Sequence, residues 1–159
     1  FFNMYSLWSF GRQLEMVCGA RAFLVIYLAA VVGGSLVSLA LHRGDRSYRA
    51  LGASGGVSGV IFAAIFLFPG ISIQLMFIPV GIPSWLFAIG FVVGSYWAMR
   101  RGLGNIGHDA HLGGALCGLA AAVVLFPQIP AARPALFAAV VLITVGLILH
   151  ARRYPVRRP

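Results

Sequence analysis

The stretch Gly52-Ala53-Ser54-Gly55-Gly56-Val57-Ser58-Gly59 decides the fold of this chain, because it opens a strongly apolar segment that runs to Phe68. A serine stands here among glycines at the expected start of a helix. A second stretch, Ala110-His111-Leu112-Gly113-Gly114, opens another apolar segment in the same way. These two helix starts indicate where an otherwise apolar chain places its polar chemistry.

The composition indicates an integral membrane protein. Of the 159 residues, 60% are hydrophobic and 9% are charged, whereas a soluble domain has about 45–50% apolar and about 25% charged residues. So few polar residues cannot cover a water-facing surface. The 12 basic residues are all arginines and lie in short connectors and in the tail. They form no stripe with interleaved aromatic residues, so we expect no nucleic-acid partner.

The two cysteines, Cys18 and Cys117, lie within apolar segments. They have no metal-ligand spacing, and we predict that they pack as small apolar residues. The sequence therefore predicts no metal and no cofactor.

Six apolar segments are long enough, or nearly so, to cross the ~30 Å hydrocarbon core of a bilayer as helices. Their approximate limits are 1–17, 21–41, 53–68, 73–99, 108–126 and 135–150, and a basic tail follows at 152–159. Pro79 and Pro83 are expected to kink the fourth segment or to delay its start. The sequence predicts an all-α polytopic membrane bundle of about six transmembrane helices, with one membrane domain over residues 1–151.

Short connectors force successive helices to alternate in direction, so the first, third and fifth segments run the same way. Asn3, Ser54 and His111 each lie near the start of one of these segments. We therefore expect the three polar side chains at one face and at similar depth. The third segment is only about 24 Å long at 1.5 Å per residue, so its start, with Ser54, should be recessed below the membrane surface.

A serine and a histidine at one depth suggest nucleophilic catalysis. A serine hydroxyl is a poor nucleophile unless a base takes its proton, and histidine, with an ordinary pKa of about 6.5, suits that task. Direct transfer needs an approach of ~2.6–3.2 Å, which small residues spaced four apart permit between helices. Such residues are Gly52, Gly55, Gly56 and Gly59 around Ser54, and Gly114 and Gly118 on the same helix face as His111.

The small number of acidic residues favours a catalytic dyad of Ser54 and His111 over a triad with a third, acidic member. Only Glu15, Asp45 and Asp109 are acidic, and residues two apart, such as Asp109 and His111, do not face each other on a helix. Acyl transfer also needs hydrogen-bond donors for the oxyanion. The backbone N–H of Ser54 and the side-chain amide of Asn3 are the candidates.

Rival and structural interpretations remain open at this point. Ser58 is a second possible nucleophile, and His108 is a second possible base. Serine is common in membrane helices because its hydroxyl bonds a carbonyl one turn earlier, and a membrane histidine can simply pack and hydrogen-bond. Asn3 can equally join helices by hydrogen bonding.

These motifs closely resemble those of the rhomboid intramembrane serine proteases. Gly52-Ala53-Ser54-Gly55 resembles the family's Gly-x-Ser-Gly nucleophile motif, and Ala110-His111-Leu112-Gly113-Gly114 resembles its Ala-His-x-x-Gly motif. Phe2-Asn3-Met4, followed by Trp8, Gly11 and Glu15, resembles the family's second helix. The resemblance covers about residues 1–126, in the family's order.

The resemblance implies roles for these residues. Ser54 would be the nucleophile, His111 the base and Asn3 an oxyanion donor in a serine endopeptidase of a multi-pass membrane protein, expected in a bacterial inner membrane. Its partners would be the lipid bilayer and single-span membrane proteins, cut in or near their transmembrane helix. The fourth helix, which carries Trp85, Phe87, Phe91 and Trp97, would correspond to the lateral gate. The alternatives are a catalytically inactive rhomboid-like protein that binds membrane clients, and a small transporter or channel.

The chain departs from the family pattern in three places. The family's first helix and the loop after it would precede residue 1, so we expect an N-terminally truncated chain. Ser58 occupies a position where the family frequently has an aromatic residue that packs on the histidine. The segment 135–150 is an additional span after the core.

The distribution of arginines and the family resemblance predict opposite orientations of the chain in the membrane. Nine arginines fall on the expected Ser54 face, namely Arg43, Arg46, Arg49, Arg100, Arg101, Arg152, Arg153, Arg157 and Arg158, and three on the other, Arg12, Arg21 and Arg133. The positive-inside rule puts the nine in the cytoplasm. The resemblance instead implies an active site that faces away from the cytoplasm, and this is the orientation we favour.

Overall fold

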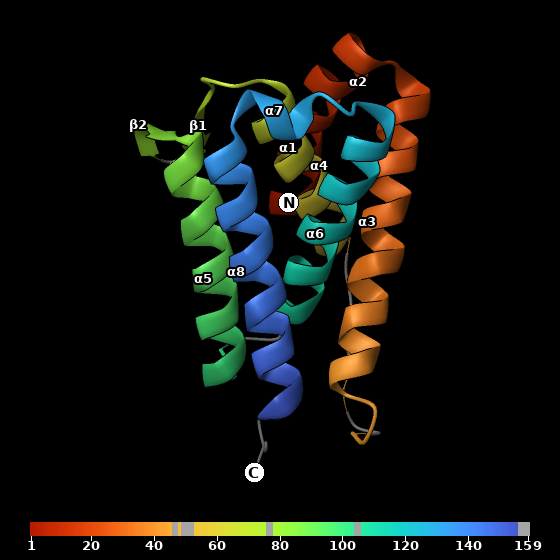
Figure 1. The fold of residues 1–159 in the computed structure, drawn as a ribbon, viewed down its shortest axis with the longest axis vertical. Coiled ribbons are helices and arrows are strands. Elements are labelled where there is room, and N and C mark those ends of the chain that lie inside the picture. The colour runs from red at the N-terminus through yellow and green to blue at the C-terminus, as the bar shows by residue number, and fades with distance from the viewer. Residues whose placement is uncertain (46–47, 49–52, 76–77, 104–105, 156–159) are drawn as a thin grey trace.

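The computed structural model describes residues 1–45, 48, 53–75, 78–103 and 106–155 (Figure 1). The chain is almost entirely helical. Its elements are α1 (Phe2–Ser6), the π-helical turn η1 (Leu7–Gly11), α2 (Arg12–Cys18), α3 (Ala20–Leu41), α4 (Ser54–Leu67), β1 (Ser72–Leu75), β2 (Ile78–Pro83), α5 (Ser84–Arg101), α6 (His108–Leu125), α7 (Ile129–Ala132) and α8 (Pro134–Arg153).

The predicted all-α membrane bundle is confirmed, and helices occupy all six predicted apolar segments. Among the described helices, α3, α6 and α8 are long and apolar enough to cross a membrane, and α4 is a shorter apolar helix. Three helices among the described residues thus qualify as membrane spans by length and composition. The apolar segments of the sequence had predicted about six. The long helices α3, α5 and α8 descend in Figure 1, whereas α4 and α6 ascend, as alternation predicts.

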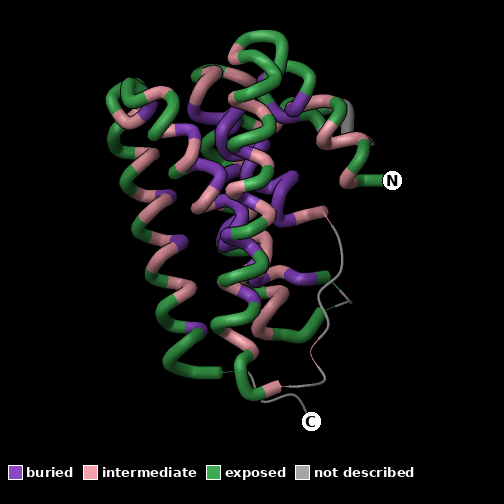
Figure 2. The backbone as a smooth tube through the Cα atoms, turned by 90° about the vertical axis from the view of Figure 1, so that its right-hand side faces the viewer, coloured by how far each residue is buried: buried purple, intermediate pink, exposed green. Residues whose placement is uncertain are grey.

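The centre of the bundle is α4. All residues from Gly55 to Phe66 are buried, and the buried part of the backbone in Figure 2 is concentrated in the middle of the molecule. With 14 residues, α4 is only about 21 Å long at 1.5 Å per residue. It begins well inside the bundle, above the lower ends of α3, α5 and α8 (Figure 1). The α4 start thus lies deeper in the bundle than the ends of its neighbours, and its depth below a membrane surface stays a prediction.

The helix predicted within 73–99 starts late, one of the two effects expected of Pro79 and Pro83, but the strands that precede it were not predicted. Strands β1 and β2 pair antiparallel, with Ser72 opposite Pro83 and Ile73 opposite Ile82, and α5 begins only at Ser84. Proline lacks the backbone N–H that a helix interior needs, and it disfavours helical geometry in the residue before it. Pro79 and Pro83 together therefore exclude helix from this stretch, which lies at the end of the molecule opposite the α6 start (Figure 1).

Other boundaries differ only slightly. The last long helix, α8, covers Pro134–Arg153 rather than 135–150, so part of the predicted basic tail is helical, and residues 156–159 lie outside the described residues. The short helix α7 was not predicted. A turn at Gly19, with φ of +84°, separates α2 from α3, because this left-handed backbone region favours glycine.

Candidate active site

Ser54 is the first residue of α4 and is half-buried. The N–H groups of a helix's first turn have no partner within the helix. Here the backbone bond that precedes the regular helical ladder runs from the Val57 N–H to the Ala53 carbonyl, at 3.0 Å. The Ser54 N–H therefore belongs to the first turn, whose N–H groups have no partner within the helix.

Glycines bring the backbones of α4 and α6 into direct contact. A Cβ added at Gly114 would meet the main chain of Gly55, and one added at Gly118 would meet the main chain of Gly59. A Cβ at Gly55 would lie 3.0 Å from the carbonyl oxygen of Ala110. Because Gly55 follows Ser54 and Ala110 precedes His111, the two candidate residues lie on turns whose backbones touch.

Gly56 is a packing glycine with a different partner from the one predicted. A Cβ at Gly56 would lie 2.6 Å from the Val31 side chain and 2.7 Å from the Tyr27 ring, both on α3. Successive helix residues are about 100° apart around the helix axis, so Gly56 cannot share the α6 contact of Gly55. The predicted packing residue Gly52 lies outside the described residues.

A second glycine contact, between α3 and α6, was not predicted. A Cβ at Gly34 would lie 2.7 Å from the Ala110 carbonyl oxygen, and one at Gly33 would meet the Cys117 side chain. The adjacent glycines Gly33 and Gly34 were the feature of the sequence that could have predicted this contact between α3 and α6. The Ala110 carbonyl is thus enclosed between Gly34 and Gly55, so the turn that carries His111 is held from two helices.

His111 packs against rings from two places. Its imidazole centroid lies 5.5 Å from the ring of Phe91 on α5, with an interplanar angle of 33°. It also lies 5.6 Å from the His108 ring, almost perpendicular to it at 88°. Phe91 therefore provides the aromatic contact that Ser58 cannot. The resemblance assigned Phe91 only to the helix that corresponds to the lateral gate, because nothing local in the sequence pairs it with His111.

The two rival residues have other hydrogen-bond partners. The Ser58 hydroxyl donates to the Ser54 carbonyl at 2.8 Å, and Ser58 is 2% exposed. This is the helix back-bond that favours a structural role. A ring nitrogen of His108, Nε2, lies 3.1 Å from the Leu103 carbonyl oxygen, so it contacts the connection that precedes α6.

Within the described part of the chain, the side chains of Ser54, His111 and Asn3 form no hydrogen bond with one another. Catalytic hydrogen bonds are often long in unliganded sites and tighten when substrate binds. Asn3 is half-buried on α1, which contacts α4. Among the described residues, no three His, Cys, Asp or Glu side chains are grouped to hold a metal ion.

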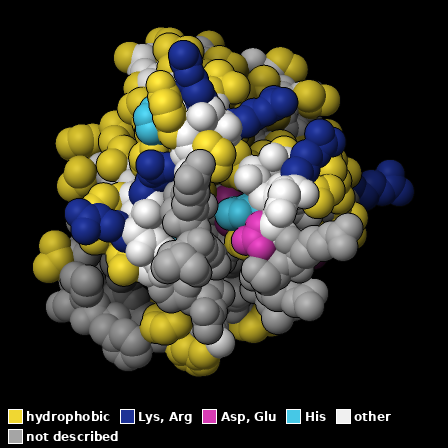
Figure 3. Space-filling view, turned by 90° about the horizontal axis from the view of Figure 1, so that it is seen from below, with side chains coloured by type: hydrophobic (Ala, Val, Ile, Leu, Met, Phe, Trp, Pro, Cys, Tyr) yellow, Lys and Arg dark blue, Asp and Glu magenta, His cyan; other side chains and the backbone are white. Residues whose placement is uncertain are grey.

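Arginines surround the end of the molecule where α3, α5 and α8 finish. Figure 3 shows this end, with arginine side chains around a centre where acidic and histidine side chains lie together. The described members are Arg43, Arg100, Arg101, Arg152 and Arg153. Arg46, Arg49, Arg157 and Arg158 lie outside the described residues. This distribution agrees with the predicted charge asymmetry, and the membrane orientation remains a prediction.

Comparisons with known proteins agree with the motifs. The family model described as Rhomboid domain matches residues 1–128. The chain is 35% identical over 120 residues to Rhomboid protein 1, mitochondrial, of Saccharomyces cerevisiae, which covers 74% of this chain and 35% of that protein. It is 32% identical over 157 residues to Rhomboid protease GluP of Bacillus subtilis, covering 97% of this chain and 29% of that protein.

A plant relative, RHOMBOID-like protein 12, mitochondrial, of Arabidopsis thaliana, is 33% identical over 129 residues, covering 71% of this chain and 38% of that protein. The chain thus spans about a third of the length of these curated relatives. No solved structure matched the chain.

Proposed function

This chain belongs to the rhomboid family, and from that membership we propose that it is an intramembrane serine endopeptidase. It is an integral membrane protein whose helices form a polytopic bundle. The proposed reaction is hydrolysis of a peptide bond in the transmembrane segment of another membrane protein.

The observation that carries this proposal is the contact of Gly55 with Ala110 and Gly114. Side chains as short as serine and histidine can react across two helices only where the backbones touch. The contact lies one residue from both Ser54 and His111, inside the bundle. Ordinary helix packing would need the glycines but would not need a nucleophile and a base beside them.

The proposed mechanism is acyl transfer through a dyad. His111 accepts the Ser54 proton as Oγ attacks the scissile carbonyl carbon. The resulting oxyanion takes hydrogen bonds from the Ser54 N–H and the Asn3 amide. The C–N bond then breaks, and His111 donates its proton to the departing amine. Water, deprotonated by His111, attacks the acyl-enzyme ester and releases the carboxylic product and free Ser54.

The proposed substrates are single-span membrane proteins, which would reach Ser54 from the bilayer. Helix α5 carries two exposed tryptophans, Trp85 and Trp97, whose exposed fractions are 51% and 54%. Exposed aromatic side chains suit a helix that contacts lipid or an entering transmembrane segment. We propose α5 as the lateral gate. No solute or nucleic-acid partner is needed for this reaction.

We propose a bacterial inner membrane as the location. The similarity to Rhomboid protease GluP of Bacillus subtilis covers 97% of the chain and so extends along α8. The similarity to the yeast mitochondrial relative covers 74% of the chain. The more complete match supports the bacterial assignment.

The test is cleavage of a single-span substrate by the full protein in liposomes. Ser54→Ala and His111→Ala should each abolish cleavage and also abolish labelling by a serine-directed fluorophosphonate. Ser58→Ala is the matched control, because it removes a serine hydroxyl one turn away. If the unmodified protein binds membrane clients but neither cleaves nor labels, the chain is a catalytically inactive client-binding member of the family.

A further inference from the structure

Asp109 is a buried acid whose function the proposed dyad leaves unexplained. It is 2% exposed, whereas Glu15 is exposed and Asp45 is half-buried. Removing a carboxylate from water is costly unless partners replace the lost hydration. The buried Asp109 carboxylate therefore needs hydrogen-bond or charged partners at its position.

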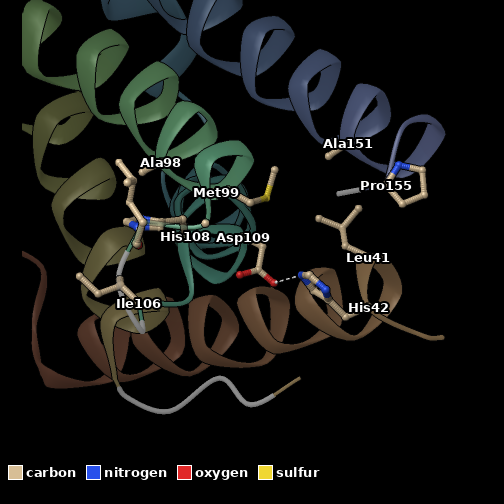
Figure 4. Close-up of a pocket in the computed structure, with 11 residues that line it drawn as sticks. Leu41, His42, Ala98, Met99, Ile106, His108, Asp109, Ala151 and Pro155 are labelled. Atoms are coloured by element: carbon tan, nitrogen blue, oxygen red, sulfur yellow. Dashed lines mark hydrogen bonds and ion pairs between the residues drawn. The ribbon is translucent and has the colours of Figure 1, made fainter. Parts of the chain in front are cut away.

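Two side chains from the α3–α4 region contact the Asp109 carboxylate. The Tyr48 hydroxyl lies 2.7 Å from one carboxylate oxygen and 2.8 Å from the other. Nε2 of His42 lies 3.4 Å from Oδ2. The His42 and Tyr48 rings stack at 3.6 Å with an angle of 4°. Figure 4 shows His42 and Asp109 pointing toward each other from the end of α3 and the start of α6, while His108 points away.

This cluster joins the three chain segments that determine where the dyad lies. His42 directly follows α3, and Tyr48 belongs to the segment that leads from α3 to Ser54. Asp109 lies in the first turn of α6, two residues before His111. A shift of the α6 start relative to the end of α3 would therefore stretch the contacts of Asp109.

The residue between Asp109 and His111 is fixed as well. The Ala110 carbonyl is enclosed by Gly34 and Gly55. At the glycine contacts the backbones of α6, α3 and α4 touch, which sets the distances between these helices. The Asp109 cluster adds a directional attachment, because hydrogen bonds to a carboxylate depend on geometry. Together the two kinds of contact define both the separation and the rotation of the α6 first turn.

We infer that Asp109 is a positioning residue, whose contacts with Tyr48 and His42 hold His111 in register with Ser54. Asp109 does not face His111 on the helix, so it acts through the α6 backbone rather than as a third member of a triad. The inference rests on the proposed protease function, because register between the two residues matters only if they react together.

An acid in the first turn of a helix also stabilises the helix dipole without any partner. Tyr48→Phe separates the two effects, since it keeps the Asp109 charge and removes the hydroxyl. Asp109→Asn complements it by keeping the side-chain shape and an acceptor while removing the charge. Tyr96→Phe is the matched control, because its hydroxyl also bonds a histidine, His150 Nδ1 at 2.6 Å, without contacting Asp109.

The experiment measures the rate of fluorophosphonate labelling per folded molecule, together with kcat and KM for a transmembrane substrate. A misplacement of ~1 Å can lower a rate on the order of 10²-fold. We expect Tyr48→Phe and Asp109→Asn each to slow labelling and to lower kcat by at least about tenfold, with KM unchanged. The double variant should lose no more than the worse single variant, because the two residues form one unit. Tyr96→Phe should label at the unmodified rate.

Normal labelling per folded molecule in either Tyr48→Phe or Asp109→Asn, even with lower thermal stability, would overturn the inference. So would a double variant whose loss is the product of the two single losses. The proposed function fails separately, if Ser54→Ala still labels and cleaves. An inactive Ser54→Ala beside a fully active Asp109→Asn would leave the protease proposal intact and refute only the positioning role.

Discussion

The main chain of Gly55 lies directly against Gly114, so closely that a Cβ on residue 114 would overlap Gly55 backbone atoms. This contact joins the helix start that carries Ser54 to the turn that follows His111. The distance between the helix turns that carry Ser54 and His111 therefore depends on residues 55 and 114 having no Cβ.

Gly114→Ala should destabilise the bundle and separate the dyad. Neither Gly55 nor Gly114 has a flexible side chain that could yield, so α4 and α6 must move apart. Overpacking of this kind costs about 1–3 kcal/mol, and the midpoint of thermal unfolding in detergent should fall accordingly. Gly90→Ala is the control, because a Cβ there meets nothing within 4 Å and alanine favours helix over glycine by about 1 kcal/mol. Equal stability of the two variants would contradict the contact.

Phe91→Ala should slow catalysis because it removes the ring that packs on His111 at 5.5 Å. A freely rotating imidazole spends less time oriented toward Ser54, and we expect fluorophosphonate labelling to slow by about tenfold, within the range that orientation contributes. Phe91→Tyr should retain most of the rate. Trp97→Ala on the same helix is exposed and should leave labelling unchanged. If Phe91→Ala labels normally, the ring contact is irrelevant to the reaction.

Ser58→Ala should leave cleavage intact. The Ser58 hydroxyl bonds the Ser54 carbonyl, and loss of one such bond changes the free energy of unfolding by about 1 kcal/mol. Labelled peptides from the unmodified protein should carry the probe on Ser54. Detection of the probe on Ser58 would assign the nucleophile to the rival serine.

Orientation can be measured with single cysteines in a variant that lacks Cys18 and Cys117. The family resemblance predicts that a cysteine in place of Arg101, at the Ser54 end, reacts with a membrane-impermeant maleimide in intact cells. A cysteine in place of Arg12, at the other end, should react only after permeabilisation. The reverse pattern would mean that the arginine distribution sets the orientation, as the positive-inside rule requires.

Much of this architecture follows from local features of the chain. Apolar length predicts the helices, alternation predicts their directions, and the glycines beside Ser54 and His111 predict the α4–α6 contact. The paired strands β1 and β2 are the main feature that was not predicted. Pro79 and Pro83 signalled a delayed helix, but the pairing of Ser72 with Pro83 joins residues that no helical or apolar period connects.

The fold class, the membrane character and the candidate residues Ser54, His111 and Asn3 could be derived from composition and spacing, because apolarity, helix periodicity and motif chemistry are local properties. The neighbours of those residues could not. Phe91 against His111, Gly34 against Ala110, and Tyr48 with His42 on Asp109 each join segments far apart in the chain. Such contacts depend on the rotation and offset of packed helices, which only the folded backbone determines.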